Sequence, residues 1–273
     1  MVAQIDSRYV VLRPQKLWSR LVSYLLFEGR PLTTRGQWIN PIIFGFFRLV
    51  KWLPNKRLVK QPIFILGTGR SGTTILGVVL SMHKEVGFLN EPKALWHSIY
   101  PNEDLIGSYS RKEARYRLLD IDASHMIIDN SHKLYSAYLT TSLSRRVVDK
   151  YPELIFRLPF IKSIFADAKF IFLTRNGWDT CHSIETWSKR LGDSSSGEVH
   201  DWWGANRRKW NLLLDQIVPE YDDLYPNVKA MRDWNNHAHM AALEWIVTMR
   251  EGMRILREYP GDVAQVRYED LCE

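Results

Sequence analysis

The stretch that most constrains the fold of this chain is a short apolar run that leads through a glycine-rich turn into a helical pattern. Residues 62–66 are apolar, residues 67–74 spell GTGRSGTT, and residues 75–82 have the helical pattern. Glycines allow a tight turn that exposes consecutive backbone N–H groups, and the N-terminus of the following helix adds partial positive charge. The sequence therefore predicts an anion-binding loop between a strand and a helix.

Beyond residue 60 the chain alternates between short apolar runs and helical patterns. We expect further strands at residues 86–89, 126–128, 145–148, 169–174 and 263–268. We expect helices at residues 152–165, 178–189, 201–218 and 234–257, with Pro159 breaking or kinking the first, and a flexible loop at residues 192–197. Such alternation is typical of a parallel sheet covered by helices. The predicted fold class is α/β in three layers, with a central, mostly parallel sheet flanked by helices.

The positive charge of the chain is concentrated at its N-terminal end. The formal net charge is +7, and residues 1–60 alone hold 11 basic and two acidic residues. The remaining 213 residues hold 26 basic and 28 acidic side chains, so that part is nearly neutral. A nucleic-acid-binding protein needs a basic working face, and we expect no nucleic-acid partner. We divide the chain into a basic helical extension, residues 1–60, and a domain, residues 61–273.

Two amphipathic segments lie in this extension, at residues 16–27 and 41–53. A basic, aromatic and amphipathic segment binds anionic membrane surfaces, whereas short helices also form by packing on a domain. Both alternatives stay open, with membrane contact assigned to residues 16–57. A spanning helix needs about 20 apolar residues, and no such run or secretory signal is found in the sequence. We expect a cytoplasmic location; of the two alternatives, membrane contact would make the protein peripheral at the inner membrane surface.

The glycine-rich loop matches only part of the Walker pattern G-x-x-x-x-G-K-[ST]. Gly67, Gly72 and Thr74 match, but Thr73 takes the position of the lysine. That lysine reaches the terminal phosphates in nucleoside triphosphatases, so its absence disfavours ATP or GTP hydrolysis. A cationic side chain occurs three residues earlier, at Arg70.

This loop resembles that of the sulfotransferase family that uses 3′-phosphoadenosine 5′-phosphosulfate (PAPS), closer to its carbohydrate, membrane-type and bacterial branch than to its cytosolic branch. The resemblance implies a P-loop-like fold and 5′-phosphosulfate binding by Gly69, Arg70, Ser71, Gly72, Thr73 and Thr74. The family's second signature is an Arg after a buried strand and a Ser eight residues later. Arg175 and Ser183 have this spacing, which implies that they bind the 3′-phosphate. Two helical turns bring the pair to one face.

Further matches extend the resemblance from residue 61 to residue 271. Residues 149–153, 166–171 and 266–271 are similar to three other conserved family segments, whereas the first 60 residues lie outside the resemblance. In this family more helix and a nucleotide-covering loop follow the last of these segments. The given sequence ends two residues after it, and the resemblance leaves open whether this is a C-terminally truncated form.

Sulfuryl transfer requires a positioned acceptor, charge stabilisation and removal of the acceptor's proton. The resemblance assigns the base to Glu91, which follows the second strand; a carboxylate at a helix N-terminus is the alternative. Arg70 and Lys150 are candidates for neutralising the transferred group, and solvated charge is the alternative for Lys150. His97 and His132 are rival bases. The reaction needs no metal, and the histidines lack the spacing of a metal site.

The acceptor stays open between small molecules, glycans and lipids. Residues 201–210 combine tryptophans with cations, although at least two of Trp202, Trp203 and Trp210 are expected in the core. The predicted function is transfer of a sulfuryl group from PAPS to a hydroxyl or amine. A nucleotide kinase or other phosphoryl transferase, and a non-catalytic nucleotide-binding protein, are the alternatives.

Overall fold

A five-stranded parallel sheet forms the centre of the molecule. The computed structural model describes residues 11, 13–14, 16–32, 34–54, 58–191, 193–195 and 198–273. The strand order is β2-β3-β1-β4-β8, and every neighbouring pair runs parallel. The strands are β1 (Ile63–Gly67), β2 (Val86–Asn90), β3 (Arg146–Lys150), β4 (Lys169–Thr174) and β8 (Val263–Arg267). This arrangement confirms the predicted α/β class.

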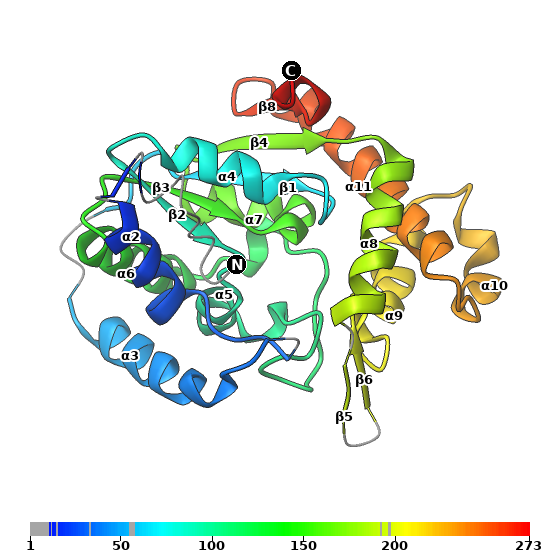
Figure 1. Cartoon of the computed structure of the whole chain (residues 1–273), viewed down its shortest axis with the longest axis horizontal. Helices are drawn as coiled ribbons and strands as arrows, with labels where there is room; N and C mark the ends of the chain where they lie inside the picture. Colours follow the sequence, from blue (N-terminus) through cyan, green and yellow to red (C-terminus); the bar gives the residue numbers. More distant parts are fainter. Residues whose placement is uncertain are drawn as a thin grey trace.

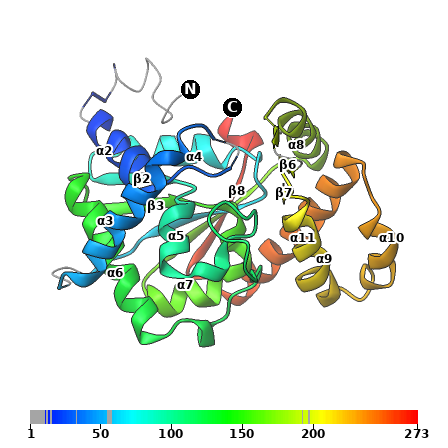
Figure 2. The same cartoon turned by 90° about the horizontal axis from the view of Figure 1, so that it is seen from below.

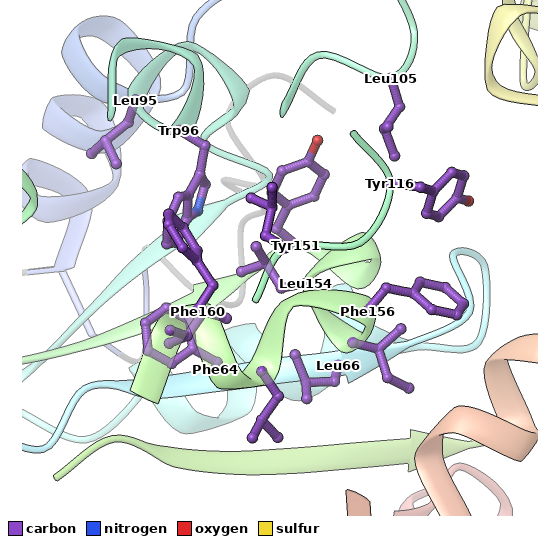
Figure 3. Packing of buried hydrophobic residues seen from close by; sticks show 14 of the residues in the cluster. Phe64, Leu66, Leu95, Trp96, Leu105, Tyr116, Tyr151, Leu154, Phe156 and Phe160 are labelled. Atoms are coloured by element: carbon purple, nitrogen blue, oxygen red, sulfur yellow. The ribbon is translucent and has the colours of Figure 1, made fainter. Parts of the chain in front are cut away.

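Helices cover both faces of the sheet, because the strands are apolar on both sides (Figure 1). On one face, Ile65 and Phe88 pack with Leu76 of α4 (Thr73–Ser81). On the other face, Phe64 stacks on Phe170 with ring centroids 5.7 Å apart. Figure 3 shows Phe64 and Leu66 pointing toward Trp96, Phe160 and Leu154. The helices on this second side are α5 (Lys93–Ile99), α6 (His125–Thr141), α7 (Leu158–Ile164) and α11 (His237–Glu258).

A group of helices and a small sheet lie to one side of the main sheet in both views (Figures 1 and 2). The helices are α8 (Gly177–Leu191), α9 (Arg208–Gln216) and α10 (Val228–Arg232), and they join α11. The small antiparallel sheet consists of β5 (Asp193–Ser195), β6 (Glu198–Asp201) and β7 (Gly204–Ala205). Strand β5 falls within the loop expected at residues 192–197; residues 192, 196 and 197 lie outside the described residues.

The N-terminal helices pack on the domain: the first, with the turn that follows it, covers the edge strand β2, and the second packs on α5 and α6. They are α2 (Lys16–Val22), which continues into a π-helical turn (Ser23–Phe27), and α3 (Asn40–Trp52). Lys16 Nζ donates to the carbonyl oxygen of Val86 at 2.6 Å, and Arg20 Nη1 donates to that of Phe88 at 2.6 Å. An edge strand leaves carbonyl groups unpaired, and these two cations satisfy two of them.

Two sequence-based elements are wrong. Residues 126–128 form no strand, because they lie in the first turns of α6, where the Ser124 side chain caps the helix by accepting from the N–H of Ile127 at 3.4 Å. The helix predicted at residues 201–218 begins only at Arg208, since Asp201 ends β6 and Gly204 begins β7.

The other predicted elements are confirmed to within a few residues. Residues 145–148 belong to β3, and residues 169–174 and 263–268 correspond to β4 and β8. Residues 152–165 form a 3₁₀ segment (Pro152–Arg157) followed by α7, with Pro159 in the first turn of α7, where its missing N–H costs no hydrogen bond.

Candidate active site

A pocket of about 830 Å³ lies at the carboxyl edge of the sheet. Parallel α/β sheets place ligands at this edge, where the loops after the strands converge. Here the loops after all five strands contribute, together with residues before α3 and after α8. The lining residues discussed below are Glu28, Arg30, Arg35, Gly69, Arg70, Gly72, Thr73, Thr74, Glu91, Lys93, Lys150, Glu153, Arg175, Ser183, Trp187, Asp201, Trp202, Lys209 and Tyr268.

The glycine-rich loop between β1 and α4 forms one wall of this pocket. Arg70 and Gly72 have left-handed backbones, with φ of 68° and 97°, and α4 begins directly after Gly72. The Ser71 hydroxyl donates to the carbonyl oxygen of Thr68 at 2.6 Å, so the Ser71 side chain is buried in the loop and does not line the pocket. Gly69, Arg70, Gly72, Thr73 and Thr74 line it. The loop thus presents a helix N-terminus to the cavity.

Glycine is required at two points of this wall by close neighbours. A Cβ atom on Gly69 would lie 2.3 Å from the indole of Trp202, and one on Gly72 would lie 2.2 Å from the ring of Tyr268. These distances are shorter than any ordinary contact, and the φ of Gly72 disfavours a side chain in any case. The two aromatic rings therefore rest directly on the loop backbone.

Arg70, Arg175 and Ser183 come together on the β4–α8 side of the loop. Arg70 Nε donates to Ser183 Oγ at 3.2 Å, and Arg175 Nη1 donates to the carbonyl oxygen of Arg70 at 2.9 Å. The Arg175 guanidinium lies over the Tyr268 ring, 4.5 Å from its centroid. Arg175 Nε is buried and has no partner among the described residues. A buried cationic donor without an acceptor is costly, so this corner suits an anion.

Glu91 lies at the end of β2 between two lysines. Its side chain is 37% exposed; Lys150 Nζ lies 2.5 Å from one carboxylate oxygen, and Lys93 Nζ lies 3.4 Å from the other. Burial favours the neutral acid, but the charges of Lys150 and Lys93 outweigh it and lower the pKa of Glu91 well below its ordinary value. Glu91 also has a left-handed backbone, with φ of 50°. The carboxylate is thus ionised and held in place.

Sequence reasoning missed a buried ionic network behind Glu91. Lys209 Nζ contacts Glu153 at 3.2 Å and Glu244 at 2.6 Å, and Trp202 Nε1 donates to Glu244 at 2.7 Å. Burial disfavours the charge of Lys209, but Glu244 and Glu153 outweigh it and raise its pKa. Lys93 could have been noticed in the sequence because it lies two residues after Glu91. Lys209 is far from Glu91 in the sequence, and only the fold brings it to the site.

A second set of missed residues comes from the N-terminal extension. Glu28, Arg30 and Arg35 line the pocket. Glu28 accepts from the backbone N–H of Asn90 at 2.9 Å, and its own carbonyl oxygen accepts from Ala94 at 3.4 Å. The extension is therefore part of the pocket wall, although its sequence carries no recognisable motif.

The two candidate histidines lie away from this pocket. His97 packs against the rings of Phe44 and Tyr109, with centroids 5.8 and 5.4 Å away. His132 accepts from the backbone N–H of Val59 at 3.3 Å through Nδ1. Burial lowers the pKa of both, and neither lines the cavity. Both are packing residues here.

The tryptophans of residues 201–210 divide between the core and the pocket. Trp203 and Trp210 are buried in the core, as expected for at least two of the three tryptophans, whereas Trp202 lines the pocket.

Two further observations concern metals and membranes. Across the described ranges, no group of three or more His, Cys, Asp and Glu side chains is arranged to hold a metal ion. None of the helices in the described part of the chain has both the length and the apolar character needed to cross a bilayer.

Comparison with known proteins points to one family. The profile of the Sulfotransferase family matches residues 62–228. The nodulation protein NoeE of Sinorhizobium fredii is 28% identical over 136 residues, which cover 45% of this chain and 31% of that protein. The match therefore spans less than a third of this curated relative.

Solved structures give similar matches. A sulfotransferase domain from the curacin biosynthetic pathway has a TM-score of 0.44 and 18% identity, covering 79% of this chain and 69% of that one. The sulfotransferase of Alicyclobacillus acidocaldarius has a TM-score of 0.41 and 15% identity, with coverages of 79% and 76%. Sulfotransferase STF1 of Mycobacterium tuberculosis has a TM-score of 0.40 and 15% identity, and the match covers 98% of this chain and 80% of that one.

Proposed function

The chain belongs to the sulfotransferase family, and from this premise we propose that it moves a sulfuryl group from PAPS to a hydroxyl or amine acceptor. The unpartnered Nε of Arg175, beside Ser183 and the glycine-rich loop, is the observation that carries the proposal. A nucleotide with phosphate at both its 3′ and 5′ positions would meet both anion-binding corners of one pocket.

The charge of the pocket lining supports PAPS as the ligand. Seven basic and four acidic side chains line the pocket, which suits an anionic ligand. We assign the 5′-phosphosulfate to the loop, with Gly69, Arg70, Gly72, Thr73 and Thr74 lining the cavity, and the 3′-phosphate to Arg175 and Ser183. Ser71 would serve by shaping the loop through its bond to Thr68.

The chemistry supplied by bound PAPS is an activated sulfuryl group with PAP (3′-phosphoadenosine 5′-phosphate) as leaving group. In the transfer, a bond forms between acceptor oxygen or nitrogen and sulfur, and the bond between sulfur and the 5′-phosphate oxygen breaks. Arg70 and Lys150 would stabilise charge on the transferred and leaving groups. Glu91 would take the acceptor's proton. None of these roles needs a metal.

The two lysines that contact Glu91, Lys150 and Lys93, affect its ability to act as the base. A carboxylate with a strongly lowered pKa is a weak base, so Glu91 gains basicity only when at least one lysine turns to another anion. Lys150, 2.5 Å from Glu91, is the natural one, because the donor's phosphosulfate would compete for it. Donor binding would then both place the sulfuryl group and free the base.

The part of the pocket lining that includes Trp202, which rests on the loop, suits an acceptor that carries hydroxyl groups. Trp187 and Trp202 meet edge to face with centroids 5.5 Å apart, and Glu153 and Asp201 lie on the same lining. Aromatic faces with neighbouring carboxylates fit sugar rings. Small-molecule and glycan acceptors are therefore the first to test, with lipids next.

The experiment follows PAP release from PAPS with a panel of hydroxyl and amine acceptors. Glu91→Gln should lower transfer by about 10²–10⁴-fold, the usual contribution of a positioned base, and should still bind PAP. Glu258→Gln, an exposed change on α11, is the matched control and should behave as the parent. Full activity of Glu91→Gln would refute the assignment of the base, and no transfer to any acceptor by the parent would count against the function.

A further inference from the structure

Helix α3 and its flanking residues have two apolar faces, and the described residues cover one of them. Ile43, Phe47 and Val50 are buried against the core. On the other side, Ile42, Leu49 and Trp52 of α3 are exposed by 60%, 55% and 82%. Trp38, in the 3₁₀ turn before the helix (Gln37–Ile39), and Leu53, just after it, are exposed by 75% and 45%. We call these five residues the outer face of α3. Amphipathic helices of globular proteins normally carry polar residues on the solvent side, so this face is unusual.

The outer face is continuous along the helix. Positions 38, 42, 45, 49 and 52 are three or four residues apart, which places them on one stripe. Position 45 is a glycine, and a Cβ atom added there would meet nothing within 4 Å. Figures 1 and 2 both show α3 at the periphery of the molecule. The stripe runs about 21 Å along the axis, with a tryptophan at each end.

The charged residues on α3 and in the adjoining stretches of the sequence are all basic. No acidic residue occurs between Glu28 and Glu85, whereas residues 29–60 include seven lysines and arginines. Arg35, Arg48 and Lys60 are exposed. On α6, which packs against α3, the carboxylate of Asp129 pairs with Lys133. The outer face therefore presents apolar and aromatic side chains in basic surroundings.

From this pattern we propose that α3 docks on the surface of an anionic lipid membrane, lying in the plane of the interface. The helix has 13 residues, too few to span a bilayer. Burial of an apolar face together with attraction of basic residues to anionic lipids is how interfacial helices bind, and tryptophans prefer this zone. The proposal is independent of the sulfuryl-transfer chemistry.

Docking through α3 would also bring the pocket close to the membrane. Pro31, Thr34 and Arg35 line the pocket and lie a few residues before α3 in the chain. An acceptor held at the membrane interface would then reach Glu91 without passing through bulk water.

The test is sedimentation of the full chain with vesicles of phosphatidylcholine alone or of phosphatidylcholine with one quarter phosphatidylglycerol. We expect binding to the anionic vesicles, weaker binding at high salt, and little binding to the neutral ones. Ile42→Glu with Leu49→Glu should reduce the partition coefficient at least about tenfold. Val79→Glu with Met253→Glu removes two exposed apolar side chains from α4 and α11 and is the control.

Melting temperature and PAP binding of each variant show whether it folds as the parent. No binding of the parent to anionic vesicles would overturn the proposal, as would an equal loss in the control. Size-exclusion chromatography with light scattering tests whether a second copy covers the outer face instead. If the parent is a dimer and the variant with Ile42→Glu and Leu49→Glu is a monomer, the membrane proposal is overturned.

Discussion

Two non-glycine residues at the pocket have left-handed backbones, Arg70 with φ of 68° and Glu91 with φ of 50°. Such conformations cost about 1–3 kcal/mol for residues other than glycine and persist where the surroundings fix them. The carbonyl oxygen of Arg70 is held by Arg175, and the N–H of Glu91 donates to Lys150 at 2.7 Å. The two side chains proposed to act on the transferred group and the acceptor are therefore positioned by the backbone before any ligand arrives.

Asp149 gives a pH-dependent stability that can be measured. Its carboxylate is buried in β3 and accepts from Trp96 at 3.0 Å and from the Tyr135 hydroxyl. Burial outweighs these bonds and raises its pKa to about 7. The folded state thus binds a proton more tightly than the unfolded chain, so this group destabilises the fold progressively as pH rises from about 4 through 7.

The variant Asp149→Asn cannot ionise and should lose that part of the pH dependence. In urea unfolding at pH 5 and pH 8, the parent should be less stable at pH 8, and the variant should show a smaller difference. Glu103, whose pKa burial also raises to about 7, keeps its contribution in both proteins. An unchanged difference in the variant would mean that Asp149 stays ionised or does not titrate in this range.

At the residue scale the sequence predicted the anion-binding corners but not the walls around them. Arg70, Arg175, Ser183, Glu91 and Lys150 belong to motifs that are local in sequence, and the structure brings all five to one pocket. Arg35 belongs to no such motif, and Trp202 and Lys209 lie in residues 201–210, whose combination of tryptophans and cations did not predict their place in the site. They reach the pocket through packing between distant segments, which no local periodicity records.

At the scale of elements, the glycine-rich loop and Trp202 form a unit that a double-mutant cycle can test. Gly69→Ala would place Cβ 2.3 Å from Trp202, so it should weaken PAP binding by displacing the ring or the loop. Trp202→Ala should remove much of that penalty, giving a coupling of about 1–3 kcal/mol by calorimetry. Gly45→Ala, where a Cβ meets nothing, is the control. Additive effects would contradict the contact.

The buried ion pair that links α2 to the residue after the π-helical turn should be a large contributor to stability, since both of its members also bond to β2. Arg20 and Glu28 form a buried ion pair at 2.7 Å, with side chains 1% and 7% exposed. Arg20→Met leaves the Glu28 carboxylate without this partner, which typically costs about 3–5 kcal/mol. The control Arg250→Met breaks an exposed pair with Asp223 and should cost less than about 1 kcal/mol. Equal losses of unfolding free energy would be inconsistent with this interpretation.

Short apolar runs predicted the strands of the sheet, but the shortest of them, at residues 126–128, did not form a strand. The strands at residues 169–174 and 263–268 have flanking turns and lie in the sheet. Residues 126–128 are only three apolar positions, a length that fits a strand or one turn of a helix equally. Ser124 decides between them as the cap of α6. At residues 201–218, the left-handed backbones of Asn206 and Arg207 delay the helix to Arg208, and nothing in the sequence marks this.

For the molecule as a whole, the pocket draws on more chain than the family profile covers. The profile matches residues 62–228, yet Glu28 and Arg35 from the extension and Tyr268 after β8 line the same cavity. The extension also shares the core beneath the sheet, through Phe27 and Phe47. The N-terminal segment is therefore part of the structure that shapes the cavity, and a fragment limited to the profile would lack that wall.

The most direct test of the donor assignment is the melting temperature in the presence of PAP, and separately of ADP with Mg²⁺. A ligand bound only by the folded state at 100 times its dissociation constant adds about 2.7 kcal/mol. We predict stabilisation by PAP alone.

Arg175→Ala should weaken PAP binding about tenfold or more, since a hydrogen bond to a charged group contributes about 1.5–3 kcal/mol. It should leave an analogue without the 3′-phosphate nearly unaffected, and Arg232→Ala, an exposed change, is the control. Stabilisation by ADP with Mg²⁺ instead, or equal losses for PAP and the analogue, would contradict the account.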